Sequence, residues 1–211
     1  MPKTLLTISV VIGSNESLII PCLASICQGT KSKFDIYVVS NQSSAEIVNE
    51  IKRQFPAVNI VLNSSCKGFA ENHNYVMECS DSEYVLILND DTLLPDGSID
   101  KLTEFMEKNK KIGVVSPKLI NPDGSLQPST YRFPNLITIF LGLSGLRSSI
   151  HPTETVLRLV NLVEKSFGLK GKSRLWKHDY TTEVDTFKGA CTLVRRKAIN
   201  EVGLMDEVTL F

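Results

Sequence analysis

The stretch Val85-Leu86-Ile87-Leu88-Asn89-Asp90-Asp91-Thr92 places four apolar residues shortly before two adjacent carboxylates. A short continuous apolar run is typical of a strand that is covered on both faces, as in a parallel sheet. Two neighbouring anions repel each other unless a cation or hydrogen-bond donors compensate for their charge. A hard divalent ion does so through oxygen ligands. The pattern therefore predicts a cation site made by Asp90 and Asp91 where a buried strand ends, although the same residues can also cap the following turn.

The remainder of the first 117 residues alternates between strand and helix patterns. Short apolar runs predict strands at residues 8–13, 36–40, 58–62, 84–89 and 112–116. Helical spacing predicts helices around residues 18–26, 47–55 and 99–106, with Ser43-x-x-Glu46 as the capping box of the second. This alternation implies an α/β fold with a mostly parallel sheet and helices on both faces. Ligands of such sheets bind beyond the carboxyl ends of the strands. The candidate site is therefore formed by the loops at 14–17, 40–44, 64–69 and 89–97.

The pattern changes after Pro117. The turn Asn121-Pro122-Asp123-Gly124 predicts a hairpin, which would form a small antiparallel extension. The apolar residues 136–146 are either a buried core helix or a surface that docks on a membrane. Further predictions are a helix at 153–167, a basic loop at 170–177, strands at 183–187 and 190–195, and a short helix at 197–202. We expect one domain over residues 1–211, with a ligand-binding half at 1–117 and a second half at 118–211.

The composition indicates a globular protein and argues against membrane-spanning, nucleic-acid-binding and zinc-stabilised proteins. Of 211 residues, 42% are apolar and 22% charged, as in a globular protein, and no run of 18 apolar residues predicts a membrane-spanning helix. The net charge is zero, with 7 Lys and Arg against 13 Asp and Glu in residues 1–105 and 16 against 10 in the remainder. A nucleic-acid binder is therefore not expected. Five cysteines without a Cys-x-x-Cys pair predict free thiols in a reducing cytoplasm rather than structural zinc.

A second motif, Asn63-x-x-x-Lys67-Gly68-Phe69-Ala70-x-x-x-Asn74, predicts a further helix that begins at Gly68. The glycine lets the backbone approach a ligand, and the free N–H groups of a helix start attract anions. The alternative is an ordinary loop and helix start. His73 lies within this helix, and we expect it to be an exposed structural histidine.

Taken together, these motifs resemble family 2 of the inverting glycosyltransferases, which have the GT-A nucleotide-diphospho-sugar transferase fold. The resemblance is carried in order by Ile8 to Ile12 with Asn15, Val38-Val39-Ser40-Asn41, Gly68-Phe69-Ala70 with Asn74, Leu88 to Thr92, Asp123 to Ser129 with Phe133-Pro134, Gly189-Ala190-Cys191 with Arg195-Arg196, and Val202 to Glu207. The order and spacing are most similar to the rhamnosyltransferase-like branch that builds bacterial surface polysaccharides.

The resemblance implies a role for individual residues. Asp91 would ligate a divalent metal, Mg or Mn, and Asp90 would face the ribose or sugar of the donor. The nucleoside would be held at Ser14, Asn15, Ser40 and Asn41, and Gly68 and Asn74 would line the donor. The partners would be a nucleotide-diphosphate sugar and a saccharide or lipid-linked acceptor. The protein would work in the cytoplasm, with peripheral contact to the inner face of the membrane.

Three departures from the family pattern affect these expectations. Gly13-Ser14-Asn15 stands where the family has Thr-Tyr-Asn, and Ser40 stands where it has an Asp that bonds the donor. The family's catalytic base follows shortly after the pair represented by Asp206-Glu207, so we expect this base to lie beyond Phe211. The acceptor-side half, 118–211, would then be C-terminally incomplete. Asp206 and Glu207 are themselves substitute candidates. Two alternatives therefore stay open: a non-catalytic nucleotide-sugar-binding remnant, and a sugar-nucleotide pyrophosphorylase, whose basic loop after the first strand is missing here.

Overall fold

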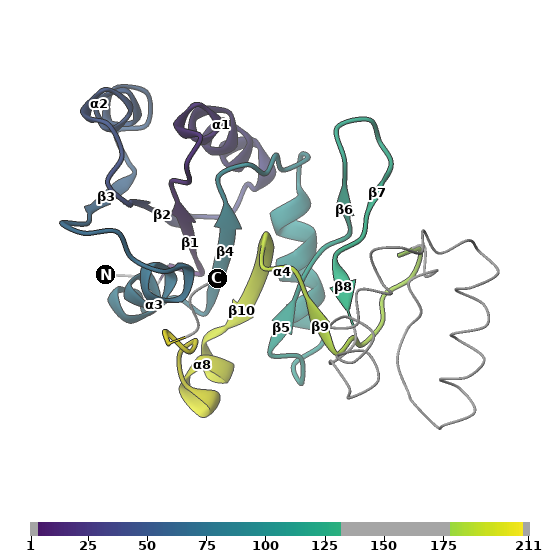
Figure 1. Cartoon of the computed structure of the whole chain (residues 1–211). Coiled ribbons are helices and arrows are strands. Elements are labelled where there is room, and N and C mark those ends of the chain that lie inside the picture. The colour runs from purple at the N-terminus through teal and green to yellow at the C-terminus, as the bar shows by residue number, and fades with distance from the viewer. Residues whose placement is uncertain (1–3, 132–177, 209–211) are drawn as a thin grey trace, which may run out of the picture. The chain divides into compact units, whose positions relative to one another are not determined.

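The computed structural model describes residues 4–131 and 178–208 (Figure 1). The chain forms two compact units, of which the first comprises Met1–Pro117 and Gly189–Phe211 and the second Lys118–Lys188. It therefore leaves the first unit after Pro117 and returns to it at Gly189. The predictions at 136–146, 153–167 and 170–177 lie outside the described residues. No helix among the described residues is long and apolar enough to cross a membrane.

The first unit is built on a six-stranded sheet in the order β3-β2-β1-β4-β10-β5. Its strands are β1 (Leu6–Val11), β2 (Phe34–Ser40), β3 (Asn59–Leu62), β4 (Tyr84–Asn89), β5 (Val114–Val115) and β10 (Cys191–Arg195). β1 pairs in parallel with β2 and β4, and β2 with β3, whereas β10 runs antiparallel to both of its neighbours. The predicted mostly parallel sheet is confirmed, with β5 shorter than the predicted 112–116.

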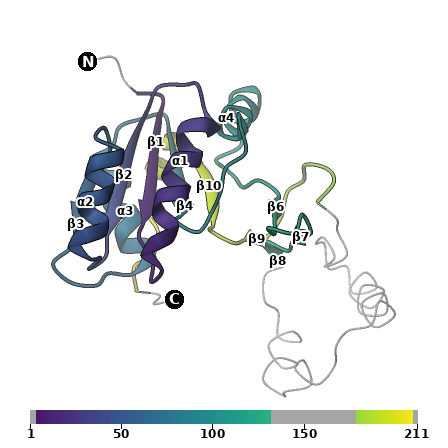
Figure 2. The ribbon, with the colours of Figure 1, turned by 90° about the horizontal axis from the view of Figure 1, so that it is seen from above.

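The helices of the first unit lie on both faces of this sheet, as predicted (Figures 1 and 2). One face carries α1 (Ile19–Gly29), α2 (Ala45–Gln54) and α4 (Ser98–Lys108), and the other carries α3 (Phe69–Cys79) and α8 (Arg196–Val202). A single 3-10 turn, η1 (Glu16–Leu18), precedes α1. α1 and α2 connect strands on one side of β1, whereas α3 leads to β4 on the other side. Because crossovers between parallel strands are right-handed, α3 lies on the opposite face of the sheet from α1 and α2.

The central strands are apolar because both of their faces are covered. Residues 84–88 of β4 are all buried, and Met77, Val85, Ile87, Val194 and Ile199 form one cluster beneath α3 and α8. At the end of β10, the buried Arg195 donates to the hydroxyl of Tyr84 (2.8 Å) and to the carbonyls of Ile112 (3.0 Å) and Met106 (2.7 Å). These bonds tie the returning segment to the first 117 residues.

The capping box predicted at Ser43 and Glu46 is wrong by one residue. Ser44 is the N-cap of α2, and its hydroxyl accepts from the backbone N–H of Ile47. The carboxylate that completes the cap comes from η1: Glu16 accepts from the Ser44 backbone N–H (2.6 Å) and from its hydroxyl (2.5 Å). A local motif was expected, but a residue 28 positions earlier supplies the bond.

The described part of the second unit consists of two short antiparallel pairs. The predicted hairpin at Asn121-Pro122-Asp123-Gly124 is confirmed, since it joins β6 (Leu119–Ile120) to β7 (Leu126–Gln127). The second pair is β8 (Thr130–Tyr131) with β9 (Thr186–Phe187), which is shorter than the strand predicted at 183–187.

Candidate functional site

The carboxyl ends of β1 and β4 meet at the point where the strand order changes direction. From β1, the chain proceeds to β2 and β3 on one side and later to β4 on the other, so this strand end is the switch point at which ligands of open α/β sheets bind. Here the backbone N–H of Gly13 donates to Oδ2 of Asp90 at 2.7 Å. A Cβ on Gly13 would lie only 3.2 Å from Oδ1 of Asp90, so glycine permits this close approach.

Asp90 and Asp91 occupy different environments at this point. Asp90 is only 8% exposed, and its pKa is raised because burial disfavours the carboxylate, an effect that the Gly13 N–H opposes and the charge of Asp91 reinforces. Asp91 is exposed. Burial and then the charge of Asp90 also raise the pKa of the nearby Cys22 thiol to about 12. The site therefore holds negative charge that favours a cation.

No lysine or arginine among the described residues forms an ion pair with either carboxylate. The donor set of Asp90 and Asp91, hard oxygen ligands in a partly buried position, fits a divalent ion. Within residues 4–131 and 178–208, no group of three or more His, Cys, Asp or Glu could hold a metal by itself. A divalent ion would therefore take part of its coordination shell from water or from a bound anion.

Ser40 and Asn41, at the end of β2, hold the neighbouring loop in place. Ser40 is buried, and its hydroxyl accepts from the backbone N–H of Ser43 at 3.2 Å. The Asn41 side chain bonds the backbone of Lys67 twice, donating to its carbonyl (3.0 Å) and accepting from its N–H (2.8 Å). The sequence pattern did not reveal this use of Asn41, because it depends on a residue 26 positions away.

Asn63 and Asn72 extend this group of side-chain amides, and neither was among the predicted site residues. Asn63 donates to Oδ1 of Asn72 at 2.7 Å, and Asn72 donates to the carbonyl of Lys67 at 3.2 Å. The amides together fix the loop that leads into α3. The backbone N–H groups of the first turn of α3 follow Gly68, the N-cap, which supplies no side-chain hydrogen bond. A Cβ added to Gly68 would meet no atom within 4 Å, so the space beside this helix start is open.

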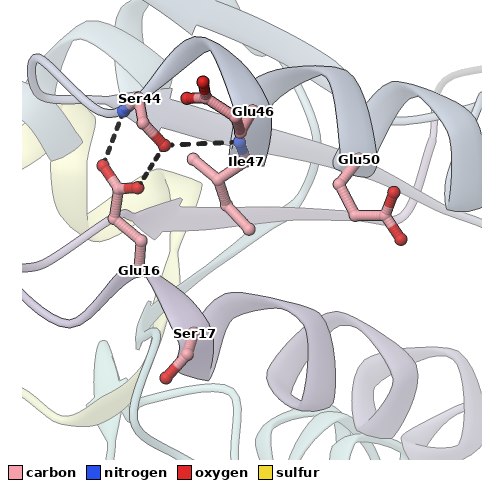
Figure 3. A pocket seen from close by; sticks show the side chains of 6 residues that line it. All are labelled: Glu16, Ser17, Ser44, Glu46, Ile47 and Glu50. Carbon is pink, nitrogen blue, oxygen red and sulfur yellow. Dashed lines mark hydrogen bonds between the residues drawn. The ribbon is translucent and has the colours of Figure 1, made fainter.

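Ser14 and Asn15 lie exposed beyond β1. The Asn15 side chain caps η1, since its Oδ1 accepts from the backbone N–H of Ser17 at 3.4 Å, and it also accepts from the Ser17 hydroxyl at 2.7 Å. Beside η1 lies an open hollow of about 440 Å³, lined by Glu16, Ser17, Ser44, Glu46, Ile47 and Glu50 (Figure 3). Figure 3 shows Glu16 reaching across to Ser44 at the start of α2. Three carboxylates line this hollow, so it is unsuited to an anionic ligand.

Asn74, on α3, contacts the C-terminal segment that carries the two substitute base candidates. The Asn74 side chain bonds the backbone of Met205 and the carboxylate of Glu207, so its polar atoms face the C-terminal segment. Asp206 accepts from the backbone N–H of Val208 at 3.0 Å and thereby caps a turn. The structure thus groups Gly13, Asp90 and Asp91 at one strand end, and Asn74 with Glu207 along the helix.

The expectation that His73 is exposed is wrong. Its side chain is fully buried, its Nδ1 lies 2.7 Å from the hydroxyl of Ser9, and its ring packs edge-on against Phe69. Burial lowers the pKa of His73 to about 4, so the ring is neutral near pH 7. The reason is the helix face: α3 crosses β1, and position 73 points at the sheet, where water is excluded.

Relatives in sequence are glycosyltransferases. A relative from Mycobacterium tuberculosis, an N-acetylglucosaminyl-diphospho-decaprenol L-rhamnosyltransferase, is 24% identical over 204 residues, which cover 88% of this chain and 59% of the relative. An uncharacterized glycosyltransferase of Haemophilus influenzae is 28% identical over 110 residues, covering 51% of this chain and 37% of the relative. The chain thus spans about three fifths of the length of the mycobacterial relative.

Solved structures with the same fold include a mannosyltransferase. Residues 1–349 of Staphylococcus aureus TarS match with a TM-score of 0.60 at 12% identity, covering 98% of this chain and 51% of that one. The mannosyltransferase PcManGT from Pyrobaculum calidifontis, solved with GDP-Man and Mn²⁺, matches with a TM-score of 0.58 at 16% identity, covering 98% and 49%. The predicted GT-A fold is confirmed. The profile of the family described as "Glycosyl transferase family 2" matches residues 8–203, and the chain therefore belongs to glycosyl transferase family 2.

Proposed function

We propose that this chain binds a nucleotide-diphosphate sugar with a divalent metal and transfers the sugar, with inversion, to a saccharide or lipid-linked acceptor. The observation that carries the proposal is the Asp90–Asp91 pair at the switch point between β1 and β4, where Asp90 is buried against Gly13 and neither carboxylate has a cationic partner among the described residues. A buried carboxylate with a raised pKa beside a second carboxylate is typical of a functional site.

On the donor side, the proposed roles follow the strand ends. Asp91, which is exposed, would hold Mg²⁺ or Mn²⁺, and Asp90 would face the ribose or sugar. The metal, when bound, would stabilise the negative charge that develops on the leaving diphosphate. The loops at Ser14-Asn15 and Ser40-Asn41 would hold the nucleoside. The start of α3 at Gly68 would present backbone N–H groups to the diphosphate.

On the acceptor side, inversion requires one direct displacement and a general base for the proton of the acceptor hydroxyl. Glu207 is the proposed substitute within the described residues, and Asp206 is less suited because it caps a turn. The mycobacterial relative acts on a decaprenol-linked sugar diphosphate, which supports a lipid-linked acceptor here. We further propose a role in bacterial cell-surface polysaccharide synthesis, at the cytoplasmic face of the membrane, with residues 1–117 serving the donor and 118–211 the acceptor.

Titration calorimetry tests the donor proposal. UDP, GDP and dTDP are titrated into the chain with and without Mn²⁺, and at least one is expected to bind more tightly with the metal. Asp91→Ala should abolish this metal-dependent gain, whereas Asp96→Ala, an exposed aspartate in the same loop, should not. If none of the three nucleotides binds the parent chain, the proposal is wrong.

A turnover assay with the matching nucleotide sugar then separates catalysis from binding. Release of the nucleoside diphosphate supports the transferase. Metal-dependent binding without any release favours the alternative, a nucleotide-sugar-binding module that does not catalyse transfer.

A further inference from the structure

The side-chain amide of Asn74 is used entirely by a segment 131 residues later in the chain. Its Nδ2 donates to the carbonyl oxygen of Met205 at 2.8 Å, and its Oδ1 accepts from the N–H of the same residue at 3.0 Å. The same Nδ2 also donates to Oε1 of Glu207 at 2.9 Å. Two bonds to one peptide backbone set both its position and its orientation, in the way that neighbouring strands pair. The third bond then selects where the Glu207 carboxylate lies.

On the side of α3 this contact is buried, whereas Met205 is half-buried and Glu207 is exposed. Asn74 is only 2% exposed, and Met205 packs against the apolar cluster beneath α3 and α8. Removing the amide would leave the N–H and carbonyl of Met205 without partners in a place that water reaches poorly. The contact therefore connects α3 to the C-terminal segment through a buried side chain, and it is not a bond between two surface residues.

The contact holds the Glu207 carboxylate beside Asn74 on α3, near enough to Lys67 for its charge to act there. The pKa of Lys67 is raised first by its hydrogen bond with Glu71, and the charge of Glu207 adds to that effect. Lys67 directly precedes Gly68, the N-cap of α3, and Asn41 bonds its backbone. One helix thus connects the loop that the amides hold in place with the segment that carries Glu207.

We propose that Asn74 is a positioning residue, which fastens Met205–Glu207 to α3 and so holds the Glu207 carboxylate beside that helix. The proposal rests on the proposed function in one respect, that the carboxylate serves the acceptor hydroxyl while the start of α3 serves the donor diphosphate. It gives Asn74 an indirect role, in place of the direct donor contact predicted from sequence. The fastening itself can be measured whether or not the chain transfers a sugar.

Hydrogen exchange of the peptide 203–208, measured by mass spectrometry in the full chain, tests the fastening. Asn74→Leu removes all three bonds. Asn74→Asp keeps an acceptor for the Met205 N–H but places a second carboxylate against Glu207. The double variant Asn74→Asp with Glu207→Gln restores a side-chain bond with donor and acceptor exchanged. Asn49→Leu, on the exposed surface of α2, is the matched control.

Both single Asn74 variants should exchange at 203–208 faster than the parent by about fivefold or more, as expected for lost hydrogen bonds of ordinary net strength. The double variant should recover part of the protection, and Asn49→Leu should match the parent. The affinity for UDP, GDP or dTDP with Mn²⁺ should stay within about twofold of the parent, because Asn74 is not a donor contact.

Unchanged exchange in the Asn74 variants would overturn the proposal, as would equal exchange in the single and double variants. A tenfold loss of nucleotide affinity without faster exchange would instead establish a donor contact. If the parent binds none of the nucleotides, the proposed function fails while the exchange data still decide the role of Asn74. Melting temperatures identify any variant that has unfolded, and in that case Asn74→Asp, the milder change, decides.

Discussion

Replacing Asp90 by asparagine should stabilise the chain while weakening the proposed metal-dependent binding of nucleotides. In the absence of metal, Asp90 is a carboxylate that is 8% exposed and lies beside Asp91. Its pKa is raised by burial and by Asp91, and these effects outweigh the opposing hydrogen bond from Gly13. Asparagine has the same shape and keeps an oxygen for the Gly13 N–H, but carries no charge. Relieving such a charge at a functional site is expected to stabilise the chain by about 1 kcal/mol, which corresponds to a rise in melting temperature of about 2–4 °C for a chain of this length.

The gain should depend on pH in a defined direction. The pKa of Asp90 is raised in the folded state above its ordinary value of 3.8. Below that value the side chain is protonated in both the folded and the unfolded state, so aspartic acid and asparagine should be equivalent. As the pH rises through the folded-state pKa, the parent acquires an unfavourable buried charge and loses stability relative to the variant. The difference should therefore be absent at acid pH and complete at neutral pH.

Thermal unfolding in EDTA at several pH values measures this difference, with Asp96→Asn, at an exposed loop position, as the control. Calorimetry with Mn²⁺ and UDP, GDP or dTDP should show at the same time that Asp90→Asn binds more weakly than the parent. A variant that is destabilised at neutral pH would refute the reasoning, because Asp90 would then contribute to folding rather than oppose it. A gain that stays constant with pH would refute the assigned electrostatic cause.

Three further predictions concern single residues. Asp91→Ala should remove metal-dependent nucleotide binding in calorimetry and change the melting temperature little, because the side chain is exposed; tight metal-dependent binding by this variant would contradict the assignment. Arg195→Met should cost about 3–5 kcal/mol in urea unfolding, because the bonds to the Tyr84 hydroxyl and to three backbone carbonyls lose their charged donor; a cost below about 1 kcal/mol would show that these bonds contribute little. The pKa of His73 is lowered from 6.5 to about 4, so the parent should lose about 3 kcal/mol of unfolding free energy as the pH falls through that interval. His73→Gln should remove most of this pH dependence, and an equal dependence in both chains would place its origin elsewhere.

The order of strands and helices in the first 117 residues could be predicted from sequence alone. The apolar run of β4 and the helical spacing in α1, α2 and α4 are local patterns. A strand that is buried on both faces is apolar along its whole length, so the sequence alone identifies it. The candidate site followed from the same patterns, because the rule that ligands bind at the carboxyl ends of parallel strands needs only the position of each strand end. Asp90 and Asp91 were found in this way.

The contacts that shape the site come from residues far apart in the chain, and only the tertiary structure decided them. The Gly13–Asp90 bond joins residues 77 positions apart, and Asn74 reaches Met205 across 131. The strand β10 inserts antiparallel between β4 and β5, although its apolar residues would suit either direction equally well. The spacing of apolar residues along a chain indicates which residues are buried, but it does not indicate which other residues they pack against. That choice is made when the strands pair and the helices pack, and it decided that Asn74 meets the C-terminal segment and that His73 lies buried beneath α3.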